Sequence, residues 1–62
     1  MRLIRLKEVK YATGLGRSTI YKYIENGTFP KSVSLGERAV AWVESEVVAW
    51  VKARIEARDL VE

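Results

Sequence analysis

The stretch that decides the fold is Thr13-Gly14-Leu15-Gly16-Arg17-Ser18-Thr19-Ile20-Tyr21. It joins two segments that predict short helices, residues 7–13, in which Val9 and Ala12 are three apart, and residues 17–26. Gly14 suits the left-handed position just after a helix, and Asn26-Gly27 is a second signal for a helix end. Two short helices separated by about three residues that include glycine match a helix-turn-helix.

The segment that follows the second helix predicts a β-hairpin. Pro30 pushes the residue before it toward extended geometry, so the helix does not continue. Apolar and polar residues then alternate over 32–35 and 38–42, on either side of Gly36-Glu37. A two-residue loop that begins with glycine suits a type II′ turn, which predicts Gly36-Glu37 as the loop.

This loop predicts one register for the hairpin. It sets Leu35 opposite Arg38, Val33 opposite Val40, and Lys31 opposite Trp42. Four apolar side chains then share one face: Val33, Leu35, Val40 and Trp42. A three-residue loop would instead set Val40 against Ser34 and break this pattern.

A third helix is expected to begin at Glu44 or Ser45 and to run to about Arg58, with acidic residues in its first turn and basic residues near its end. Residues 2–6 are expected to be a short extended lead-in. The predicted fold is therefore mainly α with a small β-hairpin, in the order helix, helix, two-stranded wing, helix. This is the order of a winged helix-turn-helix, and it forms a single domain over residues 1–62.

The composition excludes several classes of function. The chain of 62 residues has no cysteine and no histidine, so we expect no disulfide, no metal site, no cofactor and no enzymatic activity. Charged residues make up 31% of the chain, and no apolar run is long enough for a bilayer. The N-terminus lacks the apolar region of a secretory signal, so the cytoplasm is the expected compartment.

The charge distribution favours a polyanionic partner. Residues 1–36 carry seven basic and two acidic side chains, whereas residues 37–62 carry four basic and six acidic ones. One face of the protein is therefore expected to meet a polyanion such as double-stranded DNA. The alternative is a solvated surface whose asymmetry has no function.

The outward face of the second helix is the first candidate site. With Ile20 at the centre of the buried side, Tyr23 and Ile24 fall within about 60° of it. The outward side then carries Ser18, Lys22 and Glu25, with Thr19 and Tyr21 on its flanks. Hydroxyl groups, helix-start N–H groups and a cation are suited to phosphates and base edges. A cation such as Arg17 is unfavourable at a helix N-terminus, and a bound phosphate there would offset this cost, so Arg17 also favours a phosphate partner.

Each of these residues also has a structural explanation. Ser18 can supply hydrogen bonds at the start of the helix, and Lys22 can be an ordinary solvated lysine. Tyr21 can pack its ring against the hairpin rather than touch DNA, and Tyr23 is expected in the core. Trp42 and Trp50 are expected in the core as well, because large aromatic side chains supply most of the apolar area that a small domain buries.

Arg38 is the second candidate, because the predicted register places it on the apolar side of the hairpin, beside the turn. An arginine at the tip of a wing can reach a phosphate or enter a minor groove. The alternative is a surface ion pair with Glu37 or Glu44. Lys31 adds charge near the base of the hairpin. The predicted DNA-binding residues are Arg17, Ser18, Thr19, Tyr21, Lys22, Lys31 and Arg38.

Several motifs of the chain, in the same order, closely resemble those of the AlpA family of prophage-encoded regulators. The similar stretches are residues 13–21, 27–31 and 41–47, together with Leu35-Gly36, Arg38 and Trp50. The resemblance implies a winged helix-turn-helix of the MerR-like and excisionase-like type, which binds DNA through the second helix and the wing. Gly16 stands where a serine is expected in that family, and glycine is a slightly weaker helix cap. The resemblance includes no effector domain, so no small-molecule effector is expected.

Three functions remain open on the sequence. The first is a sequence-specific transcriptional regulator of a prophage or genomic island. The second is an excisionase-type recombination directionality factor that bends attachment-site DNA. The third is a protein-interaction adaptor that uses Val48, Ile55, Leu60 and Val61. On DNA, two or more copies are expected on neighbouring half-sites, which implies weak self-association or cooperative binding.

Overall fold

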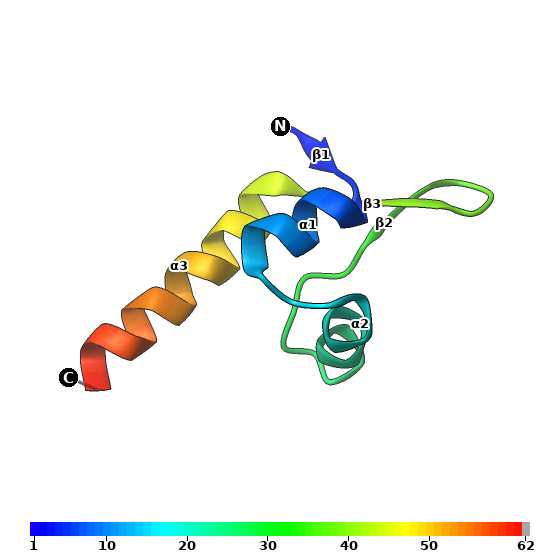
Figure 1. The fold of residues 1–62 in the computed structure, drawn as a ribbon. Helices are drawn as coiled ribbons and strands as arrows, with labels where there is room; N and C mark the ends of the chain where they lie inside the picture. Colours follow the sequence, from blue (N-terminus) through cyan, green and yellow to red (C-terminus); the bar gives the residue numbers. More distant parts are fainter. Residues whose placement is uncertain (62) are drawn as a thin grey trace.

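The computed structural model describes residues 1–61, without the side chain of Val61. Along the chain the elements are β1 (Leu3–Ile4), α1 (Leu6–Thr13), α2 (Arg17–Glu25), β2 (Val33–Gly36), β3 (Ala39–Val43) and α3 (Glu44–Val61). Figure 1 shows α1 and α2 packed beside the base of a hairpin, with α3 leaving the body on the other side. The winged helix-turn-helix predicted from the sequence is confirmed.

The turn between α1 and α2 forms as the glycines predict. Gly14 takes a left-handed conformation, with φ 73°, and its N–H group donates to the carbonyl oxygen of Lys10. The hydroxyl of Thr13 accepts a hydrogen bond from the N–H of Leu15 at 3.2 Å and donates to the carbonyl oxygen of Val9 at 2.8 Å. Gly16 is the N-cap of α2 and supplies no side-chain hydrogen bond. The connection therefore depends on backbone geometry and on Thr13.

The N-terminal lead-in is a strand of the sheet. Leu3 pairs with Val43 and Ile4 with Trp42, so that the strand order is β1-β3-β2 and all pairs are antiparallel. The side chain of Ile4 is almost fully buried. The sheet thus has three strands, one more than the two-stranded wing that the hairpin pattern describes, because two residues are too few to show an alternation.

The predicted register of the hairpin was wrong. The turn is Glu37-Arg38 rather than Gly36-Glu37, and Val33 pairs with Ala41, Ser34 with Val40 and Gly36 with Ala39. Gly36 has φ 139°, which a residue with a Cβ rarely adopts. Gly36 ends β2 opposite Ala39, and the turn therefore lies one residue further along the chain than predicted.

The extra residue on β2 lies between Ser34 and Gly36, where the register shifts and Leu35 is unpaired. Every residue of β2 is exposed, whereas Ala41 and Trp42 of β3 are fully buried. The core therefore covers β3 and leaves β2 in solvent. The alternation of Val33 and Leu35 does not mark a buried face.

The core forms where both helices of the helix-turn-helix meet β3 and the start of α3. Its buried side chains are Ile4, Val9, Ile20, Phe29, Trp42 and Val47. Trp42 is fully buried, and Trp50 is half-buried against Phe29, with ring centroids 4.9 Å apart. The predicted burial of the two tryptophans is thus complete for Trp42 and partial for Trp50.

The two indole groups also fix the segment that connects α2 to the wing. Nε1 of Trp42 donates to the carbonyl oxygen of Pro30 at 3.1 Å, and Nε1 of Trp50 donates to the carbonyl oxygen of Thr28 at 2.7 Å. Both carbonyl groups belong to the stretch that proline keeps out of helical geometry. The tryptophans therefore hold the base of the wing against the body.

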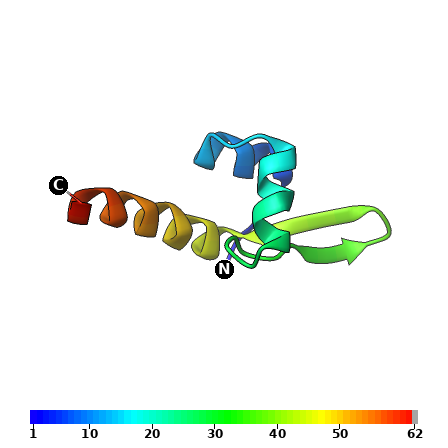
Figure 2. The ribbon, with the colours of Figure 1, turned by 90° about the horizontal axis from the view of Figure 1, so that it is seen from below.

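The wing and α3 project from the body in opposite directions, as both Figure 1 and Figure 2 show. The molecule accordingly measures 44 × 25 × 19 Å along its principal axes. The last helix begins at Glu44, one of the two predicted starts, and continues three residues beyond Arg58, near which its end was predicted, to Val61. No helix within residues 1–61 is both long and apolar enough to cross a bilayer.

Candidate nucleic-acid interface

The predicted faces of α2 are confirmed. Ile20 is fully buried, and Tyr23 and Ile24 are half-buried beside it. Ser18, Lys22 and Glu25 are exposed on the opposite side. Within residues 1–61, neither the Ser18 hydroxyl nor the Lys22 ammonium group has a protein partner, so these two groups are free to meet a ligand.

Tyr21 joins α2 to the wing. Its ring lies edge-on to Trp42 of β3, with centroids 6.2 Å apart and an interplanar angle of 65°. The ring is 36% exposed, and the guanidinium carbon of Arg17 lies 5.4 Å from its centroid. Tyr21 therefore packs against the hairpin and still presents a surface to solvent, on which it holds Arg17.

A groove of about 520 Å³ opens between α1, α2 and the wing. We call it the basic groove, and its lining residues are Arg5, Leu6, Lys7, Arg17, Tyr21, Arg38 and Val40. Four of the seven are cations and none is acidic. The structure thus brings together three of the predicted site residues, Arg17, Tyr21 and Arg38, from parts of the chain about twenty residues apart.

Two cations of the basic groove, Arg5 and Lys7, are not among the predicted site residues. Arg5 is the N-cap of α1 and Lys7 lies in its first turn, and both are exposed. Both belong to the basic half of the chain, which is the only signal that the sequence offers for them. Their distance along the chain from α2 and the wing hides their position in the fold.

The other predicted site residues lie outside the basic groove. Ser18, Thr19 and Lys22 lie on α2, where Thr19 is half-buried and the other two are exposed. Lys31 is exposed in the segment between α2 and β2. A role of these four residues in DNA binding stays a prediction.

Arg38 lies in the turn of the wing itself and is exposed, rather than on a strand opposite Leu35 as the predicted register had placed it. Its backbone has φ 61°, the left-handed region that residues with a Cβ seldom adopt. No ion pair joins Arg38 to Glu37 or Glu44 within the described residues. The alternative of a surface ion pair is therefore not supported, and the guanidinium group is free.

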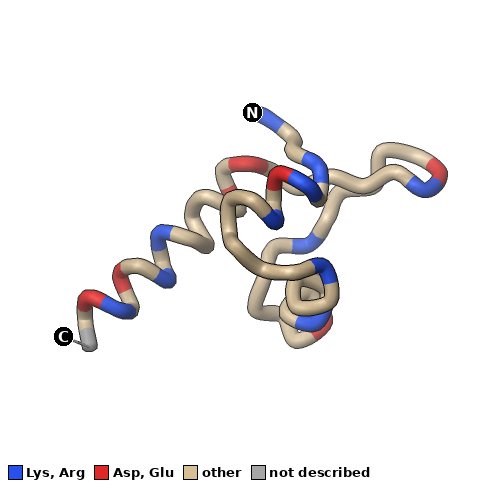
Figure 3. The backbone as a smooth tube through the Cα atoms, in the orientation of Figure 1, with Lys and Arg blue, Asp and Glu red and all other residues tan. Residues whose placement is uncertain are grey.

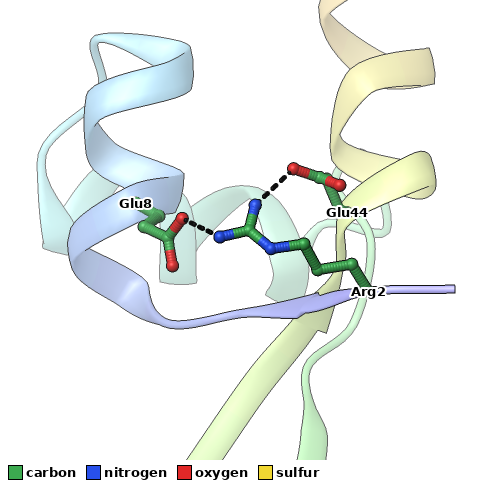
Figure 4. Close-up of polar contacts among 3 residues, drawn as sticks. All are labelled: Arg2, Glu8 and Glu44. Carbon is green, nitrogen blue, oxygen red and sulfur yellow. Dashed lines mark hydrogen bonds and ion pairs between the residues drawn. The ribbon is translucent and has the colours of Figure 1, made fainter.

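Arg2 is an exposed basic residue that forms ion pairs within the protein. Its guanidinium group bonds Glu44 at 2.7 Å and Glu8 at 3.0 Å, so that it ties β1 to α1 and α3 (Figure 4). The hydrogen bond to Glu44, together with the negative charge of Glu8, raises the pKa of Arg2 above its ordinary value. Neither carboxylate is part of the lining of the basic groove.

The charges are distributed unevenly over the fold. Figure 3 shows more Lys and Arg than Asp and Glu positions on α1 and α2, one basic and one acidic position in the wing turn, and both signs along α3. The basic side of the molecule is therefore the side of the helix-turn-helix and the wing. This is the arrangement that attracts a polyanion.

A second recess, of about 320 Å³, lies beneath α3, and its lining includes Leu15, Trp50, Ile55, Arg54 and Arg58. Val48, Ile55 and Leu60 of α3 are exposed. These are three of the four residues that the adaptor hypothesis names. The fourth, Val61, has its side chain outside the described part of the structure.

The fold and the basic groove define a small winged helix-turn-helix protein with a cationic helix and wing. The chain belongs to the family described as prophage CP4-57 regulatory protein (AlpA), whose model matches residues 2–55. The resemblance predicted from the motifs is confirmed.

Two relatives support this assignment. An uncharacterized protein, ORF88, of Enterobacteria phage P4 is 53% identical over 57 residues, which are 92% of this chain and 65% of that protein. The DNA-binding transcriptional activator AlpA of Escherichia coli strain K12 is 37% identical over 60 residues, 87% of this chain and 86% of that protein. The chain thus spans just under two thirds of the length of the phage relative.

Proposed function

We propose that this chain is a sequence-specific, DNA-binding transcriptional regulator of a prophage or genomic island, acting as a single winged helix-turn-helix domain over residues 1–62. In this proposal α2 enters the major groove, and the wing meets the backbone or the minor groove beside it. The protein acts in the cytoplasm, at the nucleoid, without a small-molecule effector. Membership of the AlpA family and the name of the E. coli relative support this proposal.

The single observation that carries the proposal is the combination of a free polar face on α2 with the free guanidinium group of Arg38 in the wing turn. Ser18 and Lys22 on α2 and Arg38 in the wing are exposed and lack protein partners among residues 1–61. Phosphate contacts from such groups set affinity and orientation, and longer side chains read base edges. Thr19, Tyr21 and Lys31 complete the proposed contact set with Arg17.

The test of the proposal is binding to duplex DNA, measured by fluorescence anisotropy at several salt concentrations. A DNA-binding protein with several phosphate contacts loses affinity steeply as salt rises. Selection of preferred sequences from a random pool then tests specificity. Weak binding that does not respond to salt, or a pool without enrichment, would contradict the proposal.

An excisionase-type factor is the main alternative, because it uses the same helix and wing. Such a protein bends attachment-site DNA and binds it in several copies. An in vitro excision assay beside a promoter reporter separates the two functions. The E. coli relative is named a transcriptional activator, which favours the regulator.

The recess beneath α3 favours a second candidate, the protein-interaction adaptor. Exposed apolar side chains beside Arg54 and Arg58 are suited to a partner with apolar and acidic groups. The two functions differ in the salt dependence of their affinity for duplex DNA. A regulator releases counterions from the DNA when it binds, so its affinity falls steeply as salt rises, whereas an adaptor is expected to bind duplex DNA weakly and without this dependence. A regulator whose copies lie on neighbouring half-sites, roughly 34–36 Å apart, would use both surfaces.

A further inference from the structure

The basic groove brings together positive charge from separate parts of the fold, and no carboxylate is part of its lining. Arg5 is the N-cap of α1, Lys7 lies on α1, Arg17 lies on α2 and Arg38 lies in the wing turn. None of the four forms an ion pair within the part of the chain that the structure describes, and the nearby carboxylates of Glu8 and Glu44 bind Arg2. Like charges gathered in this way oppose folding, and an anion bound between them would offset the cost.

The lining of the basic groove indicates which kind of anion it suits. Beside the four cations it includes Leu6, Tyr21 and Val40, so that apolar and cationic side chains line the same groove. A deoxyribose-phosphate strand offers both kinds of contact, because it has apolar sugar faces between charged phosphates. A lone phosphate ion would leave the apolar part of the groove and several of the cations unused.

The position of the groove agrees with this choice. It lies between α2 and the wing turn, and in B-form DNA a major groove and the neighbouring minor groove are separated by one sugar-phosphate strand. With α2 in the major groove and Arg38 at the minor groove, that DNA strand would run between α2 and the wing turn. The basic groove of the protein lies at this place.

We propose that the basic groove seats one phosphodiester strand of the duplex, with Arg5 and Lys7 of α1 as phosphate contacts. This inference rests on the proposed function and adds to it a third element, α1, that grips the backbone. Arg5 and Lys7 hold the strand from the side of α1, while Arg17 and Arg38 hold it from α2 and the wing. The contact set is therefore wider than the helix and wing alone.

The experiment compares Arg5→Gln and Lys7→Gln with Lys10→Gln as the matched control. Lys10 is an exposed lysine of the same helix that does not line the groove. Arg5 supplies no side-chain cap to α1, so the variants are expected to keep the fold, which circular dichroism checks. Affinity is measured by fluorescence anisotropy between roughly 50 and 200 mM salt. The probe is a mixed-sequence duplex of roughly 20 base pairs, about two helical turns.

The expected result is a decrease of about one unit in the salt slope for each groove variant, with weaker binding, and no change for Lys10→Gln. Wild-type slopes in both groove variants, with Lys22→Ala still weakening binding, would overturn the inference and leave the proposed function standing. Salt-independent or absent binding by the wild-type protein would overturn both.

A second measurement separates the strand from a small anion. Inorganic phosphate, added at the phosphate concentration of the duplex, is expected to leave the NMR signals of Arg5 and Lys7 unmoved, whereas the duplex shifts them. Equal shifts with both additions would overturn the proposal of a strand.

Discussion

The guanidinium carbon of Arg17 lies 5.4 Å from the centroid of the Tyr21 ring, one turn further along α2. The same ring packs edge-on against Trp42, which is fully buried in β3. An exposed arginine thus lies over an aromatic ring that packs against the core. In the proposed complex with DNA, an arginine already held by this contact would lose less conformational entropy on binding.

The first prediction concerns this arrangement. Tyr21→Phe keeps the ring and is expected to bind duplex DNA within about twofold of the wild type, whereas Tyr21→Leu removes the cation–π contact. At an exposed site that contact contributes about 0.5–1 kcal/mol, which is the most that losing the pre-organisation of Arg17 can cost, so binding should weaken by at most roughly two- to fivefold. Fluorescence anisotropy measures the affinity. Equal losses in both variants would show that the hydroxyl, rather than the ring, carries the effect.

The second prediction concerns the outward face of α2 and the wing turn. Lys22→Ala and Arg38→Ala are each expected to weaken duplex binding several-fold and to lower the salt slope by about one unit, because each removes one of the proposed phosphate contacts. Lys52→Ala is the control, since Lys52 is exposed on α3, away from the helix-turn-helix. If both variants bind as the wild type does, the assigned face is wrong.

The helix-turn-helix was predictable because its signals are local. Gly14 ends α1 by adopting a left-handed conformation, and Asn26 caps α2 one residue after Glu25. Each such signal acts within a few residues of its own position. The three helices therefore lie close to where the sequence places them, and the buried position of Ile20 follows from the helical period alone.

The register of the hairpin and the basic groove depend on contacts between distant residues. Gly36 can either open a turn or end a strand. Which of the two it does depends on the position of β3, and β3 is fixed by its burial in the core and by its pairing with β1. Leu35 looks like a core residue in an alternating strand, yet it is 48% exposed, because this small core covers β3 only. Arg5 and Arg38 likewise meet across a groove that no local pattern describes.

The third prediction concerns the indole of Trp50. Trp50→Phe removes the hydrogen bond to the carbonyl oxygen of Thr28, 2.7 Å long, while keeping an aromatic ring against Phe29. The free energy of unfolding is expected to fall by about 1 kcal/mol, measured by urea denaturation followed by circular dichroism. Tyr11→Phe is the control, because Tyr11 is 92% exposed and should tolerate the change. Equal stability of Trp50→Phe and the wild type would contradict a structural role for this bond.

The fourth prediction separates stability from binding at the wing turn. Arg38 has φ 61°, which costs a residue with a Cβ about 1 kcal/mol and costs glycine almost nothing. Arg38→Gly is therefore expected to raise the free energy of unfolding by about 1 kcal/mol. Arg38→Ala keeps the Cβ and the strain, so its free energy of unfolding is not expected to rise. Both variants lose the guanidinium group, so both should bind duplex DNA equally weakly. Urea denaturation measures the stability of both variants, and fluorescence anisotropy measures their affinity for duplex DNA.

Equal stability of the two variants would mean that the turn carries no strain, and wild-type affinity in either would mean that Arg38 does not contact DNA. A turn that is less stable with arginine than with glycine, but binds DNA more tightly with arginine, has a residue that is suited to the ligand rather than to the fold.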